Sequence, residues 1–116
     1  MLTERRVLLV DDEPLVRELL ASALRDERFA VDLATTVDEA KAHLVARAYD
    51  LVVADWRLPD GDGRLVADWA AELGAKTIVM SGYLAHMSGG RAHDHETLMK
   101  PIRVGDFLAL VRRAVR

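Results

Sequence analysis

The chain has 116 residues, of which 51% are hydrophobic and 30% charged, so residues 1–116 suit one compact domain with a core and are too few for two. The net charge of −3 provides no basic surface for a phosphate backbone, and the absence of cysteine excludes disulfides and thiolate metal sites. No apolar stretch is long enough to span a bilayer, so we expect a soluble, cytoplasmic protein that binds neither a membrane nor nucleic acid.

Five short apolar runs rich in Val, Ile and Leu predict buried β-strands. They cover residues 6–10, 29–34, 50–54, 76–80 and 97–99. Segments with helical spacing lie between most of these runs, so strands and helices alternate along the chain.

The first predicted helix begins near Pro14, where the missing N–H costs nothing. Four of its apolar side chains fall on one face, and these are Leu15, Leu19, Leu20 and Leu24. The second helix is expected from residue 36 to about residue 48. It opens with a capping box, in which Thr36 is the N-cap and Glu39 follows three residues later.

The third predicted helix covers residues 63–72 and is closed by Gly74, and the last covers about 104–115. Alternating strands and helices imply parallel pairing through right-handed crossovers. The pattern therefore predicts an α/β sandwich with helices on both faces of the sheet.

In such folds the ligand site lies at the carboxyl ends of the strands. Polar residues follow four of the five apolar runs, and they are Asp11 and Asp12, Asp55, Ser81 and Gly82, and Lys100 with Pro101. We therefore expect three carboxylates, one hydroxyl and one ammonium to meet at one edge of the sheet.

Three carboxylates packed together repel one another, so either their pKa values rise or a cation neutralises them. Mg²⁺ suits such a site because it prefers one or two carboxylates, several waters and phosphate oxygens. With Asp12 and Asp55 as ligands, the ion would hold a phosphoryl group in line with an Asp55 oxygen, which is the expected nucleophile. Lys100 would pair with one phosphoryl oxygen, and the Ser81 hydroxyl would bind another.

Four motifs, "LLVDDE", "DWRLPDGDG", "MSGY" and "MKPI", occur in this order, and together they strongly resemble the receiver domain of two-component response regulators. The resemblance covers residues 1–116. It implies a flavodoxin-like doubly wound sandwich whose five-stranded parallel sheet has the order 2-1-3-4-5. Parts of the pattern are also similar to single-domain response regulators with a shortened fourth helix and to hybrid-kinase receivers.

Carried over residue by residue, the resemblance implies that Asp55 is the phosphorylated aspartate. Asp11 and Asp12 would be the acidic pair that binds Mg²⁺ or Mn²⁺ together with Asp55, and the main-chain carbonyl of Arg57 would be a further ligand. Ser81 and Lys100 take the places of the family's hydroxyl and lysine. The resemblance also implies a cis bond between Lys100 and Pro101.

The chain departs from the family pattern in two places. Thr97 stands where the family usually has an aromatic switch residue, and Ser81 and Lys100 are closer in sequence than is usual. Gly89 and Gly90 interrupt the intervening segment, so we predict that the helix between the fourth and fifth strands is shortened, distorted or absent. Residues 82–96 are the expected moving part.

The expected switch region is Ser81, Gly82, Tyr83 and Thr97.

Two functions remain open at this point. In the first, the domain is a phosphoacceptor that takes a phosphoryl group from the phosphohistidine of a histidine kinase or histidine phosphotransfer protein. It would catalyse its own phosphorylation and dephosphorylation, act mainly as a signalling switch, and bind an output protein as a monomer or weak dimer, because little chain follows the last helix. The alternative is a phosphorylation-independent pseudo-receiver that only binds proteins.

Other residues have ordinary interpretations. Asp11 and Asp12 alone could cap a helix, and Asp55 alone could be a turn residue. The "HDH" at 93–95 offers two imidazoles but no evident third ligand, so a metal role there is a minor hypothesis. His43 is expected on the surface of the second helix, and Trp69 on the semi-buried face of the third.

Overall fold

A computed structural model describes residues 4–82 and 95–116 and has a five-stranded parallel sheet at its centre. The strands are β1 (Arg6–Val10), β2 (Ala30–Ala34), β3 (Leu51–Asp55), β6 (Lys76–Ser81) and β7 (Glu96–Met99). They are arranged in the order β2-β1-β3-β6-β7. Counted as the five predicted strands, this is the order 2-1-3-4-5, and the prediction is confirmed.

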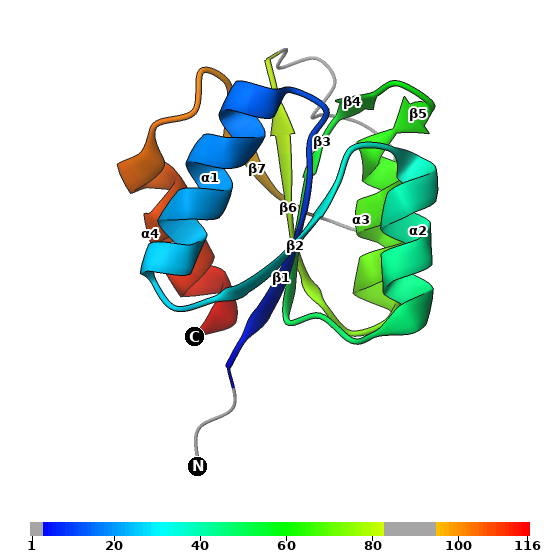
Figure 1. Cartoon of the computed structure of the whole chain (residues 1–116), viewed down its shortest axis with the longest axis horizontal. Helices are drawn as coiled ribbons and strands as arrows, with labels where there is room; N and C mark the ends of the chain where they lie inside the picture. Colours follow the sequence, from blue (N-terminus) through cyan, green and yellow to red (C-terminus); the bar gives the residue numbers. More distant parts are fainter. Residues whose placement is uncertain (1–3, 83–94) are drawn as a thin grey trace.

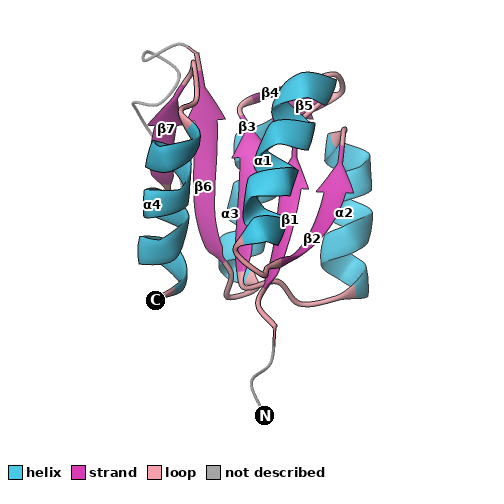
Figure 2. Cartoon of the chain, turned by 60° about the vertical axis from the view of Figure 1, so that its left-hand side comes forward, coloured by secondary structure: helices cyan, strands magenta, loops and turns pink. Residues whose placement is uncertain are grey.

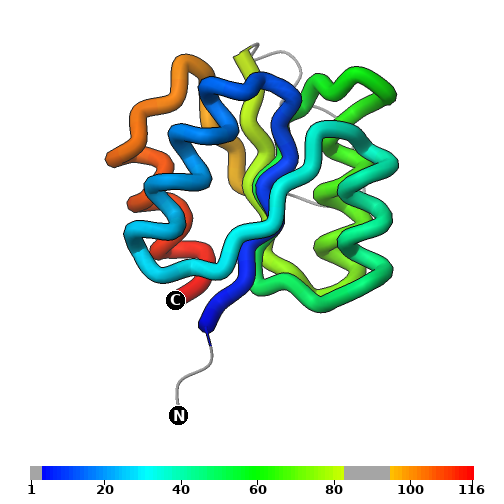
Figure 3. The backbone as a smooth tube through the Cα atoms, in the orientation of Figure 1, coloured from blue at the N-terminus to red at the C-terminus, as the bar shows by residue number. Residues whose placement is uncertain are grey.

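Helices cover both faces of this sheet, as predicted (Figure 1). One layer consists of α1 (Pro14–Asp26) and α4 (Val104–Val115), and the other of α2 (Val37–Ala46) and α3 (Gly63–Glu72). The backbone trace shows how the crossovers through α1, α2 and α3 return the chain to the same end of the sheet (Figure 3). Residues 83–94, which include Tyr83, His93 and the segment where a shortened or absent helix is predicted, lie outside the described residues. No helix among residues 4–82 and 95–116 is long and apolar enough to cross a bilayer.

The central strands are buried on both faces, which explains their continuous apolar sequences. On one side of β1 and β3, side chains such as Val7 and Val53 pack with α1 and α4 around Phe107. On the other side, Leu8 and Val52 pack with α2 and α3. Two apolar layers therefore hold the central strands rigidly between the helices.

The capping box of α2 is present with one change of partner. The Oγ1 of Thr36 accepts the Glu39 N–H at 3.0 Å, as expected of an N-cap. The Glu39 carboxylate, however, accepts the N–H of Thr35 at 2.6 Å rather than that of the N-cap itself. The helix ends at Ala46, slightly before the predicted boundary.

The predicted apolar face of α1 is partly wrong. Leu20 and Leu24 are buried, but Leu15 is 86% exposed and Leu19 is 51% exposed. The buried stripe instead runs through Val16, Leu20 and Leu24, at the four-residue spacing of one helix face. Leu15 and Leu19 precede that stripe by one residue, a rotation of about 100° about the helix axis, and so they face outward.

The turn after β3 forms a small antiparallel hairpin of β4 (Arg57–Leu58) and β5 (Gly61–Asp62). Its tip is fixed by Asp60, whose carboxylate accepts the N–H groups of Val37 at 2.7 Å and Asp38 at 3.1 Å. These are unpaired donors of the first turn of α2, where a negative charge is also favourable. The hairpin that follows Asp55 is thereby tied to a neighbouring helix.

Gly63 allows the hairpin to close against β3, and its replacement by alanine should be strongly destabilising. A Cβ atom there would lie 1.8 Å from the carbonyl oxygen of Asp55. We expect Gly63→Ala to lower the free energy of unfolding by about 1–3 kcal/mol or to prevent folding, as overpacking against backbone does. Urea denaturation followed by circular dichroism measures the change.

Gly105→Ala is the matched control, because a Cβ atom at this position in α4 meets nothing within 4 Å. Alanine should leave stability unchanged or raise it through its better helix propensity. A Gly63→Ala variant as stable as the wild type would contradict the close approach described above.

Candidate functional site

Parallel pairing of β1 with β3 places three carboxylates at the carboxyl end of the sheet. Val10 pairs with Ala54, so Asp11 and Asp55 follow as neighbours on adjacent strands. One oxygen from each of Asp11, Asp12 and Asp55 lies within 4.8 Å of the others. The structure thus brings together the three acids that the sequence predicts to converge.

Burial distinguishes these acids. Asp11 is 0% exposed and Asp55 is 5% exposed, whereas Asp12 lies at the surface. Loss of hydration raises the pKa of Asp11 to about 6. The charge of Asp55 raises this pKa further, whereas the hydrogen bond donated by the Glu13 N–H lowers it. Burial also raises the pKa of Asp55, against the stabilising effect of Lys100. Keeping Asp11 and Asp55 ionised in the folded protein therefore costs free energy.

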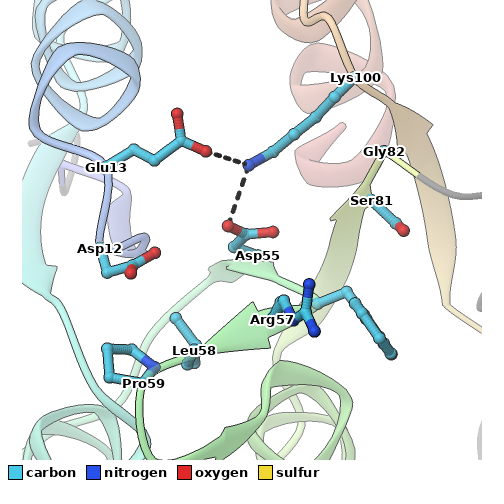
Figure 4. A pocket seen from close by; sticks show the side chains of 10 residues that line it. Asp12, Glu13, Asp55, Arg57, Leu58, Pro59, Ser81, Gly82 and Lys100 are labelled. Atoms are coloured by element: carbon cyan, nitrogen blue, oxygen red, sulfur yellow. Dashed lines mark hydrogen bonds and ion pairs between the residues drawn. The ribbon is translucent and has the colours of Figure 1, made fainter.

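Lys100 supplies a positive charge at the centre of the acids. Its Nζ lies 2.9 Å from Asp55 Oδ2 and 3.1 Å from Glu13 Oε1 (Figure 4). It also lies 4.0 Å from Asp11 Oδ2. Burial alone lowers the pKa of Lys100, but the bond with Asp55 and the charges of the acids outweigh it, so the pKa is raised. The backbone N–H of Lys100 donates to the Ser81 carbonyl at 2.9 Å, which fixes where the side chain starts.

Glu13 is a site residue that sequence reasoning missed. Its carboxylate is 57% exposed, yet it shares the Lys100 ammonium with Asp55. The only available signal was its position directly after two acids, and this does not reveal where a flexible side chain points.

The donor set suits a hard divalent cation. The Oδ2 atom of Asp11 is buried and accepts no hydrogen bond from any described residue. A buried carboxylate oxygen without a donor is costly, and a Mg²⁺ ion bound by oxygen ligands removes that cost. Asp11, Asp12 and Asp55 would hold the ion, and one ammonium and three nearby acids leave negative charge for it to neutralise.

A pocket of about 660 Å³ opens over these side chains. Asp12 and Pro59 line one side of it and Ser81 and Gly82 the other, with Arg57 between them (Figure 4). Ser81 is 1% exposed, and its hydroxyl belongs to the last residue of β6. The space is wide enough for a phosphoryl group together with part of its donor.

Comparison with known proteins identifies the family and the fold. The family model described as the response regulator receiver domain matches residues 7–112. The chain belongs to this family. It is a receiver domain of a two-component system, and the comparisons give no support to the alternative of a phosphorylation-independent pseudo-receiver.

Relatives of this receiver domain include longer regulators. The transcriptional regulatory protein ResD of Bacillus subtilis is 34% identical over 119 residues, which cover 96% of this chain and 50% of ResD. The chain thus spans about half the length of this curated relative.

Solved receiver structures superpose closely on this domain. A response regulator receiver protein from Sinorhizobium medicae has a TM-score of 0.87 and 29% identity, covering 99% of this chain and 97% of that one. The response regulator TrrA from Thermotoga maritima, solved in complex with Mg²⁺-BeF, has a TM-score of 0.80 and 29% identity, covering 95% and 98%. This likeness supports Mg²⁺ binding by the acids of the receiver domain.

Three further features that the sequence singled out can be located around the receiver site. The Lys100–Pro101 bond is cis, as the resemblance implies. Thr97 is exposed on β7, where it pairs with Val79. The Arg57 backbone N–H stabilises the Asp55 carboxylate. The guanidinium of Arg57 lies 5.9 Å from the centroid of the Trp56 ring.

Two histidines and a tryptophan outside the receiver site have structural contacts. His43 is half-buried, and its Nε2 lies 3.1 Å from the Leu33 carbonyl oxygen. Trp69 is half-buried, as predicted, beneath the Lys41 ammonium. Of the "HDH" motif, residues 93 and 94 lie outside the described part of the chain, whereas His95 is buried and bonded to side chains of α3 and β6.

Asp11→Asn should stabilise the metal-free receiver domain at neutral pH. The folded protein binds a proton at Asp11 up to pH about 6, whereas the carboxyl has a pKa of 3.8 when unperturbed. The folded state therefore holds more protons between these values, and wild-type stability falls as pH rises through that window. In EDTA at pH 7, we expect the variant to unfold with a free energy higher by about 1 kcal/mol, since asparagine can still accept the Glu13 N–H.

Chemical denaturation at pH 4 and pH 7 measures this effect, and the two proteins should be equally stable at pH 4. Mg²⁺ should then stabilise the wild type more than the variant, because a ligand that binds only the folded state raises its stability. Glu18→Gln, at an exposed position within α1, is the control. A variant less stable than the wild type at pH 7 in EDTA would overturn this account.

Proposed function

We propose that residues 1–116 form one receiver domain that takes a phosphoryl group on Asp55 from the phosphohistidine of a histidine kinase or histidine phosphotransfer protein. The observation that carries the proposal is the contact of the Lys100 ammonium with a 5%-exposed Asp55 carboxylate inside the acid cluster. A buried nucleophile held beside a cation at the base of an open pocket suits attack on a charged phosphoryl donor.

The transfer is a nucleophilic displacement at phosphorus. An Asp55 carboxylate oxygen forms the new O–P bond, and the P–N bond of the donor breaks, leaving its electron pair on the imidazole. Asp55 must be ionised for this attack. Lys100 favours the ionised form, and the Arg57 N–H does the same from the backbone.

A divalent cation at this site, Mg²⁺ or Mn²⁺, would supply positive charge to offset the charge of the phosphoryl oxygens. Asp11, Asp12 and Asp55, with the Arg57 carbonyl, are the proposed ligands. Lys100 then exchanges its bond with Asp55 for one with a phosphoryl oxygen, as a point charge able to follow it. The Ser81 hydroxyl donates to another phosphoryl oxygen.

The output is a change in protein binding. Phosphorylation adds negative charge and three acceptor oxygens, which draw Ser81 and Lys100 toward Asp55. The proposed switch region is therefore Ser81, Gly82, Tyr83 and Thr97. We expect a cytoplasmic monomer or weak dimer that presents this surface to an output partner.

Phosphorylation is tested by intact mass after incubation with acetyl phosphate and Mg²⁺. The wild type should gain one phosphoryl group, while EDTA or Asp55→Asn should abolish the gain. Asp38→Asn, an exposed acid elsewhere, should be modified like the wild type. A folded wild type that takes no phosphoryl group and binds no Mg²⁺ in calorimetric titration would favour the phosphorylation-independent pseudo-receiver.

Arg57→Ala should shorten the lifetime of the phosphorylated form. The Arg57 side chain is exposed at the pocket wall, so it can lie over a phosphoryl group and limit the approach of water. We expect hydrolysis severalfold faster in the variant, measured by loss of the added mass with time. Arg25→Ala, on an exposed part of α1, is the control, and equal rates in the wild type and Arg57→Ala would rule out this role for Arg57.

A further inference from the structure

A cluster of three hydrogen-bonded polar side chains, two of them largely buried, lies outside the phosphoryl site. His95 has a side chain only 1% exposed, and its Nε2 lies 2.6 Å from Asp68 Oδ1 while its Nδ1 lies 2.6 Å from Thr77 Oγ1. Asp68 belongs to α3, Thr77 belongs to β6, and His95 directly precedes β7. We call these three residues the His95 cluster.

The His95 cluster lies beside β7, a strand with little apolar packing. Within residues 4–82 and 95–116, β7 is the edge strand of the sheet and pairs with β6 alone, through Ile78–Ser81 and Glu96–Met99 (Figure 2). Three of its four residues are exposed, and only Leu98 packs against the core. Apolar burial therefore contributes little to fixing this strand, in contrast to β1 and β3.

Both ends of β7 are held by hydrogen bonds. At its start, His95 reaches α3 and β6, and just after its end the Lys100 N–H donates to the Ser81 carbonyl. A strand rises about 3.3 Å per residue, so a shift at residue 95 is transmitted along a short, nearly rigid segment to Lys100. The position of the Lys100 ammonium depends on how the strand start is docked.

We propose that His95 is a positioning residue for phosphoryl transfer, because it docks β7 so that Lys100 reaches Asp55. The proposal rests on the proposed function of Asp55. His95 touches neither reacting group and acts through Lys100, which lies 2.9 Å from Asp55. A misplacement of about 1 Å in such a group can lower a rate by up to a hundredfold.

The chemistry of the cluster suits a permanent anchor. Nε2–H donates to the Asp68 carboxylate, and Nδ1 accepts from the Thr77 hydroxyl when the ring is neutral. When the ring is protonated, Nδ1–H donates to the same hydroxyl, which can act as donor or acceptor. The link to α3 and β6 therefore persists in either protonation state, and removing the ring would leave Asp68 and the buried Thr77 short of a partner.

The cluster can be separated experimentally from the metal site. Asp11 and Asp12 follow β1 and Asp55 is the last residue of β3, whereas His95 directly precedes β7. Loss of His95 should thus impair the placement of Lys100 and leave the metal ligands in place. A general loss of structure would instead weaken both.

The test compares phosphorylation rates of the wild type, His95→Ala and His95→Gln with acetyl phosphate at saturating Mg²⁺. We expect His95→Ala to react about tenfold more slowly, with unchanged Mg²⁺ affinity in calorimetric titration. His95→Gln should recover much of the rate, since its amide can donate to Asp68 and accept from Thr77. His43→Ala is the matched control, because it removes another histidine ring, one that is half-buried and contacts only the Leu33 backbone oxygen among the described residues, and it should react like the wild type.

Hydrogen exchange gives a second, independent measurement. In His95→Ala the amide of Lys100 should exchange faster, while amides of β1 and β3 keep their protection. Equal phosphorylation rates and equal Lys100 exchange in wild type and His95→Ala would overturn the proposal, as would a parallel loss of Mg²⁺ affinity. If His95→Ala does not fold, Thr77→Val takes its place, since it removes one bond of the cluster while keeping a similar shape.

The two proposals fail in different ways. A wild type that takes no phosphoryl group refutes the proposed function. In that case, hydrogen exchange of the Lys100 amide alone decides whether His95 fixes the position of Lys100. A wild type that is phosphorylated at the same rate as His95→Ala leaves the proposed function intact and removes His95 from it.

Discussion

Repulsion among the carboxylates of Asp11, Asp12 and Asp55 is the constraint on which the rest of the site depends. Parallel pairing of β1 with β3 holds these groups within 4.8 Å, and the apolar layers on both faces of the sheet prevent them from moving apart. Burial makes the repulsion more costly, since two of the three have little water to solvate them. The fold therefore holds an excess of negative charge at this edge of the sheet, and nearby cations offset it.

The two sources of positive charge differ in how they are held. The acids that would bind the metal lie at the ends of central strands packed on both sides. Lys100 follows an edge strand with little apolar burial, and its ammonium is shared between Asp55 and the exposed Glu13. Acids on well-packed strands and a lysine after a less buried strand thus meet at Asp55, and this difference underlies our proposal that the ammonium follows a group added there.

Much of this site was predictable because it depends on strand order and strand ends. Asp55 follows a continuous apolar run, and parallel strands must align their carboxyl ends, so Asp11 and Lys100 could be placed beside it from sequence. The Thr36 cap was equally accessible, because it depends on residues close in the chain. Long-range side-chain contacts were not accessible in this way.

His95 shows where prediction from sequence ends. The motif "HDH" suggested a minor metal hypothesis, but the partner that decides its role, Asp68, is far away in the chain and becomes a neighbour only after α3 and β6 have packed. The error on Leu15 and Leu19 has a related cause, since helical spacing defines a stripe but not which side of it meets the sheet. Both depend on tertiary packing, which a local pattern does not contain.

Two short segments beside Asp55 are held in the same way, by a polar side chain that makes hydrogen bonds at some distance from Asp55 itself. Asp60 ties the hairpin that carries Arg57 to the first turn of α2, and His95 ties the strand that leads to Lys100 to α3. Hydrogen bonds are directional and can be exchanged singly, whereas an apolar core resists any stepwise change. Each of these two segments is therefore held beside Asp55 by a directional contact, while the two apolar layers hold the central strands.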